Sequence, residues 1–195
     1  MAEFKSITKK YDDSVVLKNF SLTLEKNTPT VIMGRSGCGK TTLLRIAAGL
    51  EKADSGTFET NGETVAYMFQ EPRLLPWKNA LDNILAPLPR DSRPIGEKYL
   101  ALVGLDVKTD GKKLPSKLSG GMRQRVAFAR FLAYAEISNA KILLLDEPFS
   151  ALDDATAQAM AKLLSDFAKD KTLLVVSHDE SDAQLLGARV LKMQA

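Results

Sequence analysis

A glycine-rich loop followed by lysine and threonine is the clearest chemical signal in the chain: Gly34-Arg35-Ser36-Gly37-Cys38-Gly39-Lys40-Thr41-Thr42. It fits the pattern G-x-x-x-x-G-K-[ST] in full, and it lies between an apolar run and a helical pattern. The glycines let the backbone curl around an oxyanion, and the following helix adds its positive end. We expect Lys40 to reach the β- and γ-phosphates of a nucleotide and Thr41 to ligate Mg²⁺. Cys38 is expected to act only as a small side chain in a crowded loop.

Two acidic residues follow a strongly apolar run later in the chain. The run Ile142-Leu143-Leu144-Leu145 predicts a buried strand that delivers Asp146 and Glu147 at its carboxyl end, where parallel sheets bind their ligands. Asp146 is placed to hold Mg²⁺, directly or through water. Glu147 is the predicted base that orients and deprotonates an attacking water. A solvated acidic pair after a core strand is the alternative, and the upstream phosphate loop argues against it.

A second anion site is predicted where Ser119, Gly120 and Gly121 open a helix, within the segment Leu118-Ser119-Gly120-Gly121-Met122-Arg123-Gln124. Backbone amides and a serine hydroxyl at a helix N-terminus can bind an anion. Within one chain, however, this would be a phosphate site with no nucleotide nearby. A simple Ser-Gly-Gly helix cap is the alternative interpretation.

The three motifs, in this order, resemble those of the ATP-binding-cassette (ABC) family of ATPases, and the resemblance covers nearly the whole chain. It implies one ABC ATPase domain over residues 1–195, with ATP and Mg²⁺ as cofactors. It also implies that two chains pack head to tail, so that Ser119 of each meets the γ-phosphate bound by the other. Asp153 matches a residue of the loop that follows the acids in this family and contacts the partner subunit.

Three further site residues are expected from the same resemblance. His178, the only histidine, follows the apolar strand Leu173–Val176 and matches the family's switch histidine, which contacts the γ-phosphate. Gln70 matches the family's glutamine loop, where it senses Mg²⁺ and the γ-phosphate. Tyr11 lies where the family keeps an aromatic residue that stacks on adenine. Ordinary surface or packing roles are the alternatives for His178 and Tyr11.

The resemblance implies the energy subunit of a transporter with separate permease subunits and, by extension, a substrate-binding protein. The segment Gln70-Glu71-Pro72-Arg73-Leu74-Leu75-Pro76-Trp77 is similar to that of the nitrate, sulfonate, taurine and thiamine-precursor importer group. Its apolar side chains would suit contact with a permease helix, or could simply pack within the loop. The alternative function is a soluble regulatory or assembly ATPase. Nucleic-acid binding has only the net charge of +3 behind it and is not expected.

Composition is consistent with one globular domain. The chain has 195 residues, of which 45% are hydrophobic and 26% charged, and its single cysteine excludes an internal disulfide. No apolar run approaches the ~20 residues that cross a bilayer, and the N-terminus lacks the apolar core of a secretory signal. Together with these observations, the resemblance to transporter ATPases implies a peripheral protein at the cytoplasmic face of the inner (plasma) membrane.

Strands alternating with helices predict an α/β fold with a P-loop NTPase core and a mainly parallel sheet. An antiparallel N-terminal part is expected at 4–9 and 17–24, joined by a turn at Asp12-Asp13-Ser14, and strands at 57–60 and 65–69 flank a turn at Asn61-Gly62. A proline-rich stretch at about 71–117, followed by a helix at about 121–135, predicts a small helical insertion over about 71–135. The chain is short for this family and is expected to lack its usual C-terminal helices. Residues 134–140 form an extra stretch before the acidic strand.

Overall fold

A computed structural model describes residues 1–12 and 14–193 of the chain. They form two compact units, each assembled from segments that are distant in the sequence. The first unit contains Met1–Tyr67, Ala140–Glu147 and the described chain from Ala168 onward. The second contains Met68–Asn139 and Pro148–Phe167.

Two sheets occur in the fold. The antiparallel sheet has the order β2-β1-β4, with β1 (Ala2–Tyr11), β2 (Ser14–Leu24) and β4 (Ser55–Glu59). The second sheet has the order β5-β6-β7-β3-β8, with β3 (Thr30–Met33), β5 (Val65–Met68), β6 (Ile142–Asp146), β7 (Thr172–Ser177) and β8 (Arg189–Lys192). In it, β3 pairs in parallel with β7 and β8, and β6 pairs in parallel with β7. Every residue of β3, β6 and β7 is buried, as expected of strands covered on both faces.

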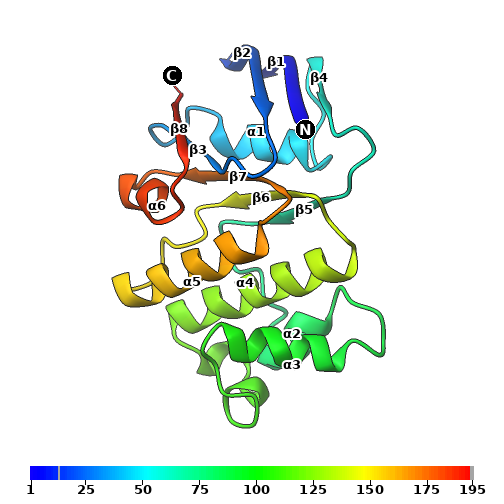
Figure 1. The fold of residues 1–195 in the computed structure, drawn as a ribbon, viewed down its shortest axis with the longest axis vertical. Coiled ribbons are helices and arrows are strands. Elements are labelled where there is room, and N and C mark those ends of the chain that lie inside the picture. Colours follow the sequence, from blue (N-terminus) through cyan, green and yellow to red (C-terminus); the bar gives the residue numbers. More distant parts are fainter. Residues whose placement is uncertain (13, 194–195) are drawn as a thin grey trace. The chain divides into compact units, whose positions relative to one another are not determined.

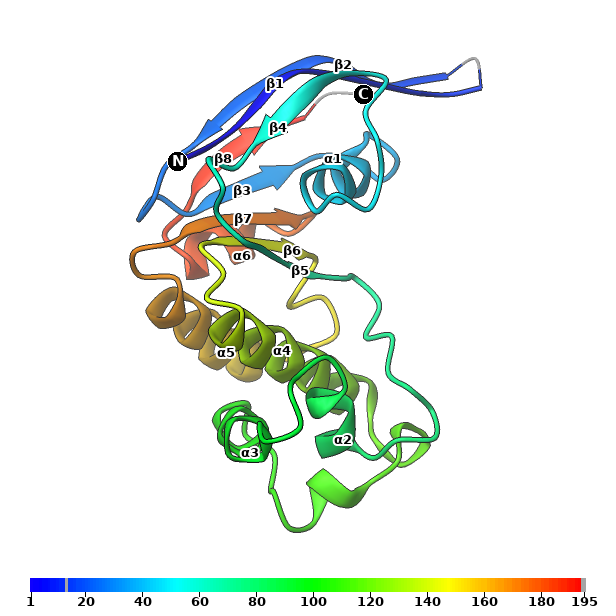
Figure 2. The ribbon, with the colours of Figure 1, turned by 90° about the vertical axis from the view of Figure 1, so that its right-hand side faces the viewer.

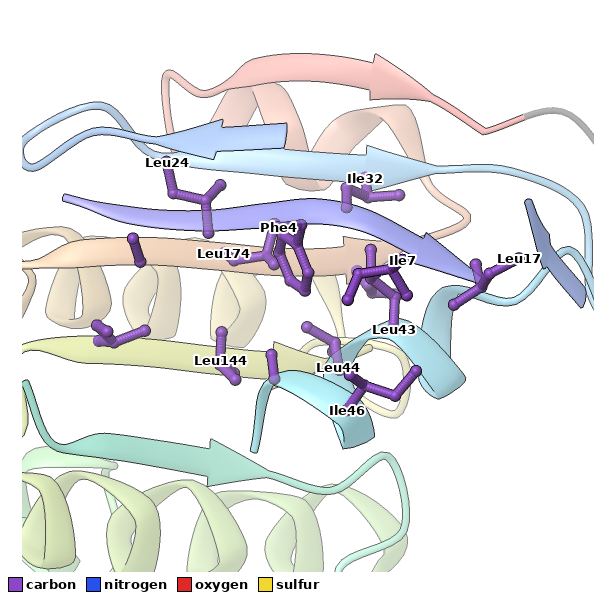
Figure 3. Close-up of a cluster of buried hydrophobic side chains, with 14 residues drawn as sticks. Phe4, Ile7, Leu17, Leu24, Ile32, Leu43, Leu44, Ile46, Leu144 and Leu174 are labelled. Atoms are coloured by element: carbon purple, nitrogen blue, oxygen red, sulfur yellow. The ribbon is translucent and has the colours of Figure 1, made fainter. Parts of the chain in front are cut away.

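The core of the first unit lies around helix α1 (Lys40–Ala47), which packs between the two sheets (Figures 1 and 2). Phe4 of β1, Leu43 of α1 and Leu174 of β7 belong to one buried apolar cluster, shown in Figure 3. Apolar residues at Leu43, Leu44 and Ala47 recur with the helical period, which explains why this face of α1 is buried. This packing fixes the start of α1, and with it the end of the phosphate loop.

The second unit is helical. Its helices are α2 (Ala80–Leu85), α3 (Arg93–Leu102), α4 (Gly120–Ile137) and α5 (Asp154–Phe167), with short 3-10 turns η1 (Asp110–Lys112) and η2 (Pro115–Lys117). Helix α4 packs against both α2 and α3 (Figure 1). Its fully buried Phe128 contacts the rings of Phe131 and Phe149. Helix α4 is therefore the central element of this unit.

The predicted fold class is confirmed, and the strands expected from the sequence are present within a few residues of their predicted ends. Strands β4 and β5 belong to different sheets, so the turn at Asn61-Gly62 leads from one sheet to the other. Helix α4 continues to Ile137 and absorbs part of the extra stretch at 134–140. The turn expected at Asp12-Asp13-Ser14 is described only in part. Asp13 lies outside the described residues, and Ser14 already begins β2.

The single domain with an insertion at 71–135 stays a prediction. Those residues lie within the second unit, which also contains Pro148–Phe167. A short helix, α6 (Glu180–Leu185), was not predicted; it contacts β3 in the first unit. Among the described helices, none combines the length and the apolar character that a bilayer span requires.

Candidate nucleotide site

Three motifs of the first unit follow the carboxyl ends of neighbouring strands. Strand β3 ends at Met33, immediately before the phosphate loop, and β6 ends at Asp146. Strand β7 ends at Ser177, immediately before His178. Met33 pairs with Ser177, and Asp146 pairs with Val176, so the strand ends are level. The phosphate loop, the acidic pair and the histidine therefore meet at one edge of the sheet, where α/β proteins bind ligands.

The backbone of the phosphate loop binds the side chain of its own lysine, Lys40. The Lys40 ammonium donates hydrogen bonds to the carbonyl oxygens of Gly34 (2.7 Å) and Arg35 (3.1 Å), and only 7% of the residue is exposed. These bonds use two of the three ammonium protons and aim the charge at the interior of the loop. An anion in the loop would meet the ammonium, the loop amides and the N-terminus of α1 together.

Glycine is required at two positions of this loop for different reasons. Gly39 has φ +96°, and a Cβ there would lie 2.9 Å from Leu17 and 3.0 Å from Val16. Gly34 has an ordinary φ, but its Cβ would lie 2.6 Å from the Cys38 Sγ atom. Cys38 is 3% exposed and fills this space, in agreement with its expected packing role. The sequence motif thus reflects both left-handed backbone and close packing.

Asp146 has the properties of a metal ligand. It is 1% exposed, and burial raises the pKa of its carboxyl group, with repulsion from Glu147 adding to the shift and the nearby Thr41 hydroxyl opposing it. Tyr67 donates to Oδ2 over 3.4 Å, while Oδ1 is buried and accepts no hydrogen bond of good geometry from any described residue. A buried carboxylate oxygen that accepts no well-aligned hydrogen bond, with a threonine hydroxyl nearby, suits a hard divalent cation such as Mg²⁺.

Glu147 and His178 contact each other at the same edge. The Nδ1 atom of His178 lies 2.8 Å from Oε2 of Glu147, whose side chain is 15% exposed compared with 63% for His178. The backbone of Glu147 has φ +47°, a left-handed conformation that is uncommon outside glycine. Its amide donates to the carbonyl of Val176 (2.9 Å). This bond to β7 fixes the position of the carboxylate that we expect to act as the base.

A buried pair that the sequence did not reveal supports the histidine segment. The Ser177 hydroxyl donates to Asp182 of α6 (2.6 Å) and accepts from the Asp179 amide (3.0 Å). Both Ser177 and Asp182 are buried, and burial raises the pKa of Asp182. The sequence pattern that could have predicted this pair is an acidic residue five positions after a serine that ends a buried strand. This pattern is too short to be specific.

Tyr11 lies near the start of α1. Its hydroxyl donates to Glu51, and the residue is 43% exposed. Burial and Glu51 raise the pKa of the Tyr11 phenol, and the nearby Thr42 hydroxyl opposes this shift. The Lys9 ammonium lies 5.2 Å from the centre of its ring. The structure thus brings Tyr11 close to Thr42, and its stacking on adenine stays a prediction.

The remaining predicted residues belong to the second unit. Ser119 is the N-cap of α4, and its hydroxyl accepts from the Met122 amide (3.1 Å). A Cβ on Gly121 would lie 3.2 Å from the carbonyl oxygen of Ala151, whereas one on Gly120 would meet no neighbour. Buried Gln124 donates to the Pro148 carbonyl (3.1 Å). The signature segment is therefore packed against the loop that precedes α5.

Asp153 ends that loop and caps α5. Its carboxylate accepts from the amide (3.0 Å) and the hydroxyl (2.8 Å) of Thr156, and these hydrogen bonds lower its pKa. Gln70 lies two residues after β5 and is exposed. The structure thus brings together the site residues of the first unit, and it places Ser119, Asp153 and Gln70 in the second.

Comparison with known proteins agrees with these motifs. A family model described as "ABC transporter" matches residues 17–150. The aliphatic sulfonates import ATP-binding protein SsuB 1 of Paraburkholderia xenovorans is 42% identical over 199 residues, covering 98% of this chain and 57% of the relative. The corresponding SsuB 2 of Agrobacterium fabrum is 44% identical over 195 residues, covering 95% of this chain and 73% of the relative. The chain spans 57% to 66% of the length of the first three curated relatives that it matches.

Solved structures show the same fold. A dimeric ATP-binding cassette in a post-hydrolysis state, bound to ADP and Pi, matches with a TM-score of 0.89 and 29% identity, covering 100% of this chain and 94% of that chain. A second dimeric structure of that cassette, described as a bacterial ABC transporter cassette, also has a TM-score of 0.89, with 29% identity and coverage of 99% and 94%.

Proposed function

The chain belongs to the ABC transporter family, and from that premise we propose that it binds and hydrolyses ATP to power substrate uptake through separate permease subunits. The observation that carries this proposal is the meeting of the phosphate loop, Asp146, Glu147 and His178 at the carboxyl edge of one sheet. Each of these groups has a distinct task in phosphoryl transfer to water.

In this proposal the loop amides and Lys40 hold the β- and γ-phosphates. Mg²⁺, when bound, would be held by Thr41 and Asp146, with Gln70 as a further ligand, and would neutralise charge on the phosphates. Glu147 takes the proton of the attacking water. His178 then has two roles: its contact with Glu147 orients the carboxylate, and its exposed ring reaches the γ-phosphate.

A second chain completes the site. Ser119 with Gly120 and Gly121 presents a hydroxyl and helix amides to the γ-phosphate held by the partner, so two ATP molecules join two chains head to tail. Asp153 lies in the loop that contacts Gly121 and is proposed to face the partner. The dimeric state of the similar solved cassettes supports this arrangement.

The proposed setting is an importer at the cytoplasmic face of the inner membrane, with permease subunits and a substrate-binding protein. Trp77 is 72% exposed, and the half-buried Leu74 and Leu75 precede it, which suits contact with a permease helix. Since several similar proteins are described as aliphatic sulfonates import ATP-binding proteins, aliphatic sulfonates are the first substrates to test.

The proposed ATP hydrolysis is tested by comparing the purified wild-type protein with the Glu147→Gln variant. The variant should bind ATP normally and hydrolyse it about 10²–10⁴-fold more slowly, because it keeps the shape of the side chain without a base. Wild-type hydrolysis by Glu147→Gln would refute the assignment of the base.

The transport part is tested by purifying the tagged protein from its native membranes in mild detergent and identifying its partners by mass spectrometry. A co-purifying multi-span permease would support the importer, and an associated binding protein would direct the search for the substrate. Recovery of soluble partners alone, with the ATPase active, would contradict the transport proposal.

A further inference from the structure

The loop between β5 and α2 presents the most exposed large apolar side chain of the described chain. That residue, Trp77, is 72% exposed and is the only tryptophan in the sequence. The loop carries no regular secondary structure between β5 and Asn79, the N-cap of α2. Its conformation must therefore be fixed by side chains from elsewhere in the second unit.

One half of this loop is held by a guanidinium group from α4. Arg130 donates to the carbonyl oxygens of Pro72 (2.5 Å) and Arg73 (3.0 Å). Arg73 has φ +44°, a conformation that residues with a side chain rarely adopt, and its own guanidinium lies 4.2 Å from the centre of the Phe69 ring. Because Arg130 binds both carbonyls through the two arms of one planar group, it fixes the direction of the chain as well as its position.

The other half is held by Asn83 of α2, which is fully buried. Its Oδ1 atom accepts from the Leu75 amide (2.7 Å), and its Nδ2 atom donates to the carbonyls of Leu75, Lys78 and Asn79 at 2.9 to 3.2 Å. Trp77 lies between these anchored positions. The loop is thus attached at one end to α4 and at the other to α2.

Helix α4 begins at the serine that the proposed function assigns to the partner's nucleotide. Ser119 caps its N-terminus, and Arg130 lies roughly three turns further along the same helix. A continuous helix is stiff over this length, so a displacement at its N-terminus moves the Arg130 guanidinium as well. Since Arg130 binds backbone, the movement reaches the loop whatever its side chains are.

We propose that Arg130 is a positioning residue that couples the nucleotide-dependent signature end of α4 to the loop carrying Trp77. This inference rests on the proposed function, because it needs the partner's nucleotide to act on Ser119. It assigns to Arg130 no contact with ATP. Loss of the guanidinium should therefore leave nucleotide binding and dimer formation intact while the response of the loop is lost.

The fluorescence of Trp77 reports this loop without a label. In the Glu147→Gln background, which retains ATP, we would measure Trp77 emission and its quenching by acrylamide with and without Mg²⁺-ATP. Sedimentation of the same samples would record dimer formation.

We expect ATP to produce a dimer and to change both optical signals. Adding Arg130→Met should abolish the optical change and leave the dimer, and Arg130→Lys should restore only part of it, because one ammonium cannot reproduce the planar two-arm contact.

Arg125 provides a matched control on the same helix. Its guanidinium also donates to two carbonyl oxygens, those of Val103 (3.1 Å) and Gly104 (3.0 Å), away from the Trp77 loop. Arg125→Met should keep the ATP-dependent change in Trp77. An unchanged response in both Arg130 variants, an absent response in the Glu147→Gln dimer, or its loss in Arg125→Met would overturn the inference. Failure of Glu147→Gln to form any ATP-dependent dimer would instead refute the proposed function.

Discussion

Glu147, the proposed base, has a backbone conformation that opposes stability. Its φ of +47° is left-handed, and a residue with a Cβ at such a position costs about 1–2 kcal/mol relative to a right-handed one. The conformation directs the carboxylate to His178, 2.8 Å away. Strain of this kind persists where function selects the geometry over the stability.

Replacing Glu147 by glycine and by alanine separates the loss of the carboxylate from the strain in the backbone. Both variants should lose hydrolysis, because neither has a base. Glu147→Gly should be more stable than Glu147→Ala by roughly 1 kcal/mol, or about 2–4 °C in Tm, since only glycine accepts the left-handed backbone without strain. Thermal unfolding without nucleotide measures the difference. Equal Tm values would show that this backbone is not strained.

Asp182 predicts a pH dependence of stability. Burial raises the pKa of this carboxyl group, so the folded protein binds its proton more tightly than the unfolded chain does. The unfavourable effect of ionising it is absent below the unfolded pKa of about 3.9 and grows as the pH rises through the folded value. Asp182→Asn keeps an oxygen that can accept from Ser177 and removes the ionisation.

Asp182→Asn should therefore gain stability relative to the wild type as the pH increases from acidic to neutral, and the gain should vanish at low pH. Thermal unfolding of both proteins over that range measures it. A difference in Tm that is the same at every pH would contradict the assignment of this shift to Asp182.

At the scale of elements, the N-cap serine of α4 has a structural role in addition to the one proposed for it. Its hydroxyl caps the helix by accepting from Met122, and Ser→Ala at such a cap typically costs about 1 kcal/mol. Aspartate caps helices equally well but carries a negative charge that repels phosphate. Ser119→Asp should thus keep the stability of the wild type and lose ATP-dependent dimer formation. Ser119→Ala should lower Tm, and it serves as the control for the cap.

Sedimentation with ATP in the Glu147→Gln background, together with Tm, distinguishes these roles. If Ser119→Asp still formed the ATP-dependent dimer, the signature segment would not face a phosphate.

Strands β3, β6 and β7 could be predicted because each contains a short apolar run that leads directly into a chemically distinctive segment. Helices α2 and α6 could not be predicted, since six residues make fewer than two turns, too short a stretch for an amphipathic pattern to recur. The phosphate loop and the acids were recognisable from local spacing. The contacts of Arg130 and Asp182 were not, because they join residues whose proximity depends on the packing of separate elements. The same reason explains why the Glu147–His178 contact required the structure.

At the scale of the whole molecule, the two segments proposed to bind phosphate belong to different compact units. Residues Lys40 and Glu147 belong to the first unit and Ser119 to the second. The proposed head-to-tail dimer has twofold symmetry, so each complete site takes its phosphate loop from one chain and its signature serine from the other. A chain that lacks one motif therefore damages one of the two sites, and the missing motif decides which one.

This symmetry predicts complementation between two inactive variants. Lys40→Met loses the phosphate loop, and Ser119→Asp loses the signature site, so each alone should be inactive. In a mixed dimer, the loop of the Ser119→Asp chain faces the intact serine of the Lys40→Met chain and forms one complete site, while the other site lacks both. Random pairing would give about a quarter of wild-type hydrolysis if sites act independently. Different affinity tags on the two chains would verify that mixed dimers form. If the mixed dimers hydrolysed ATP no faster than the sum of the two separate variants, the prediction of shared sites would be contradicted.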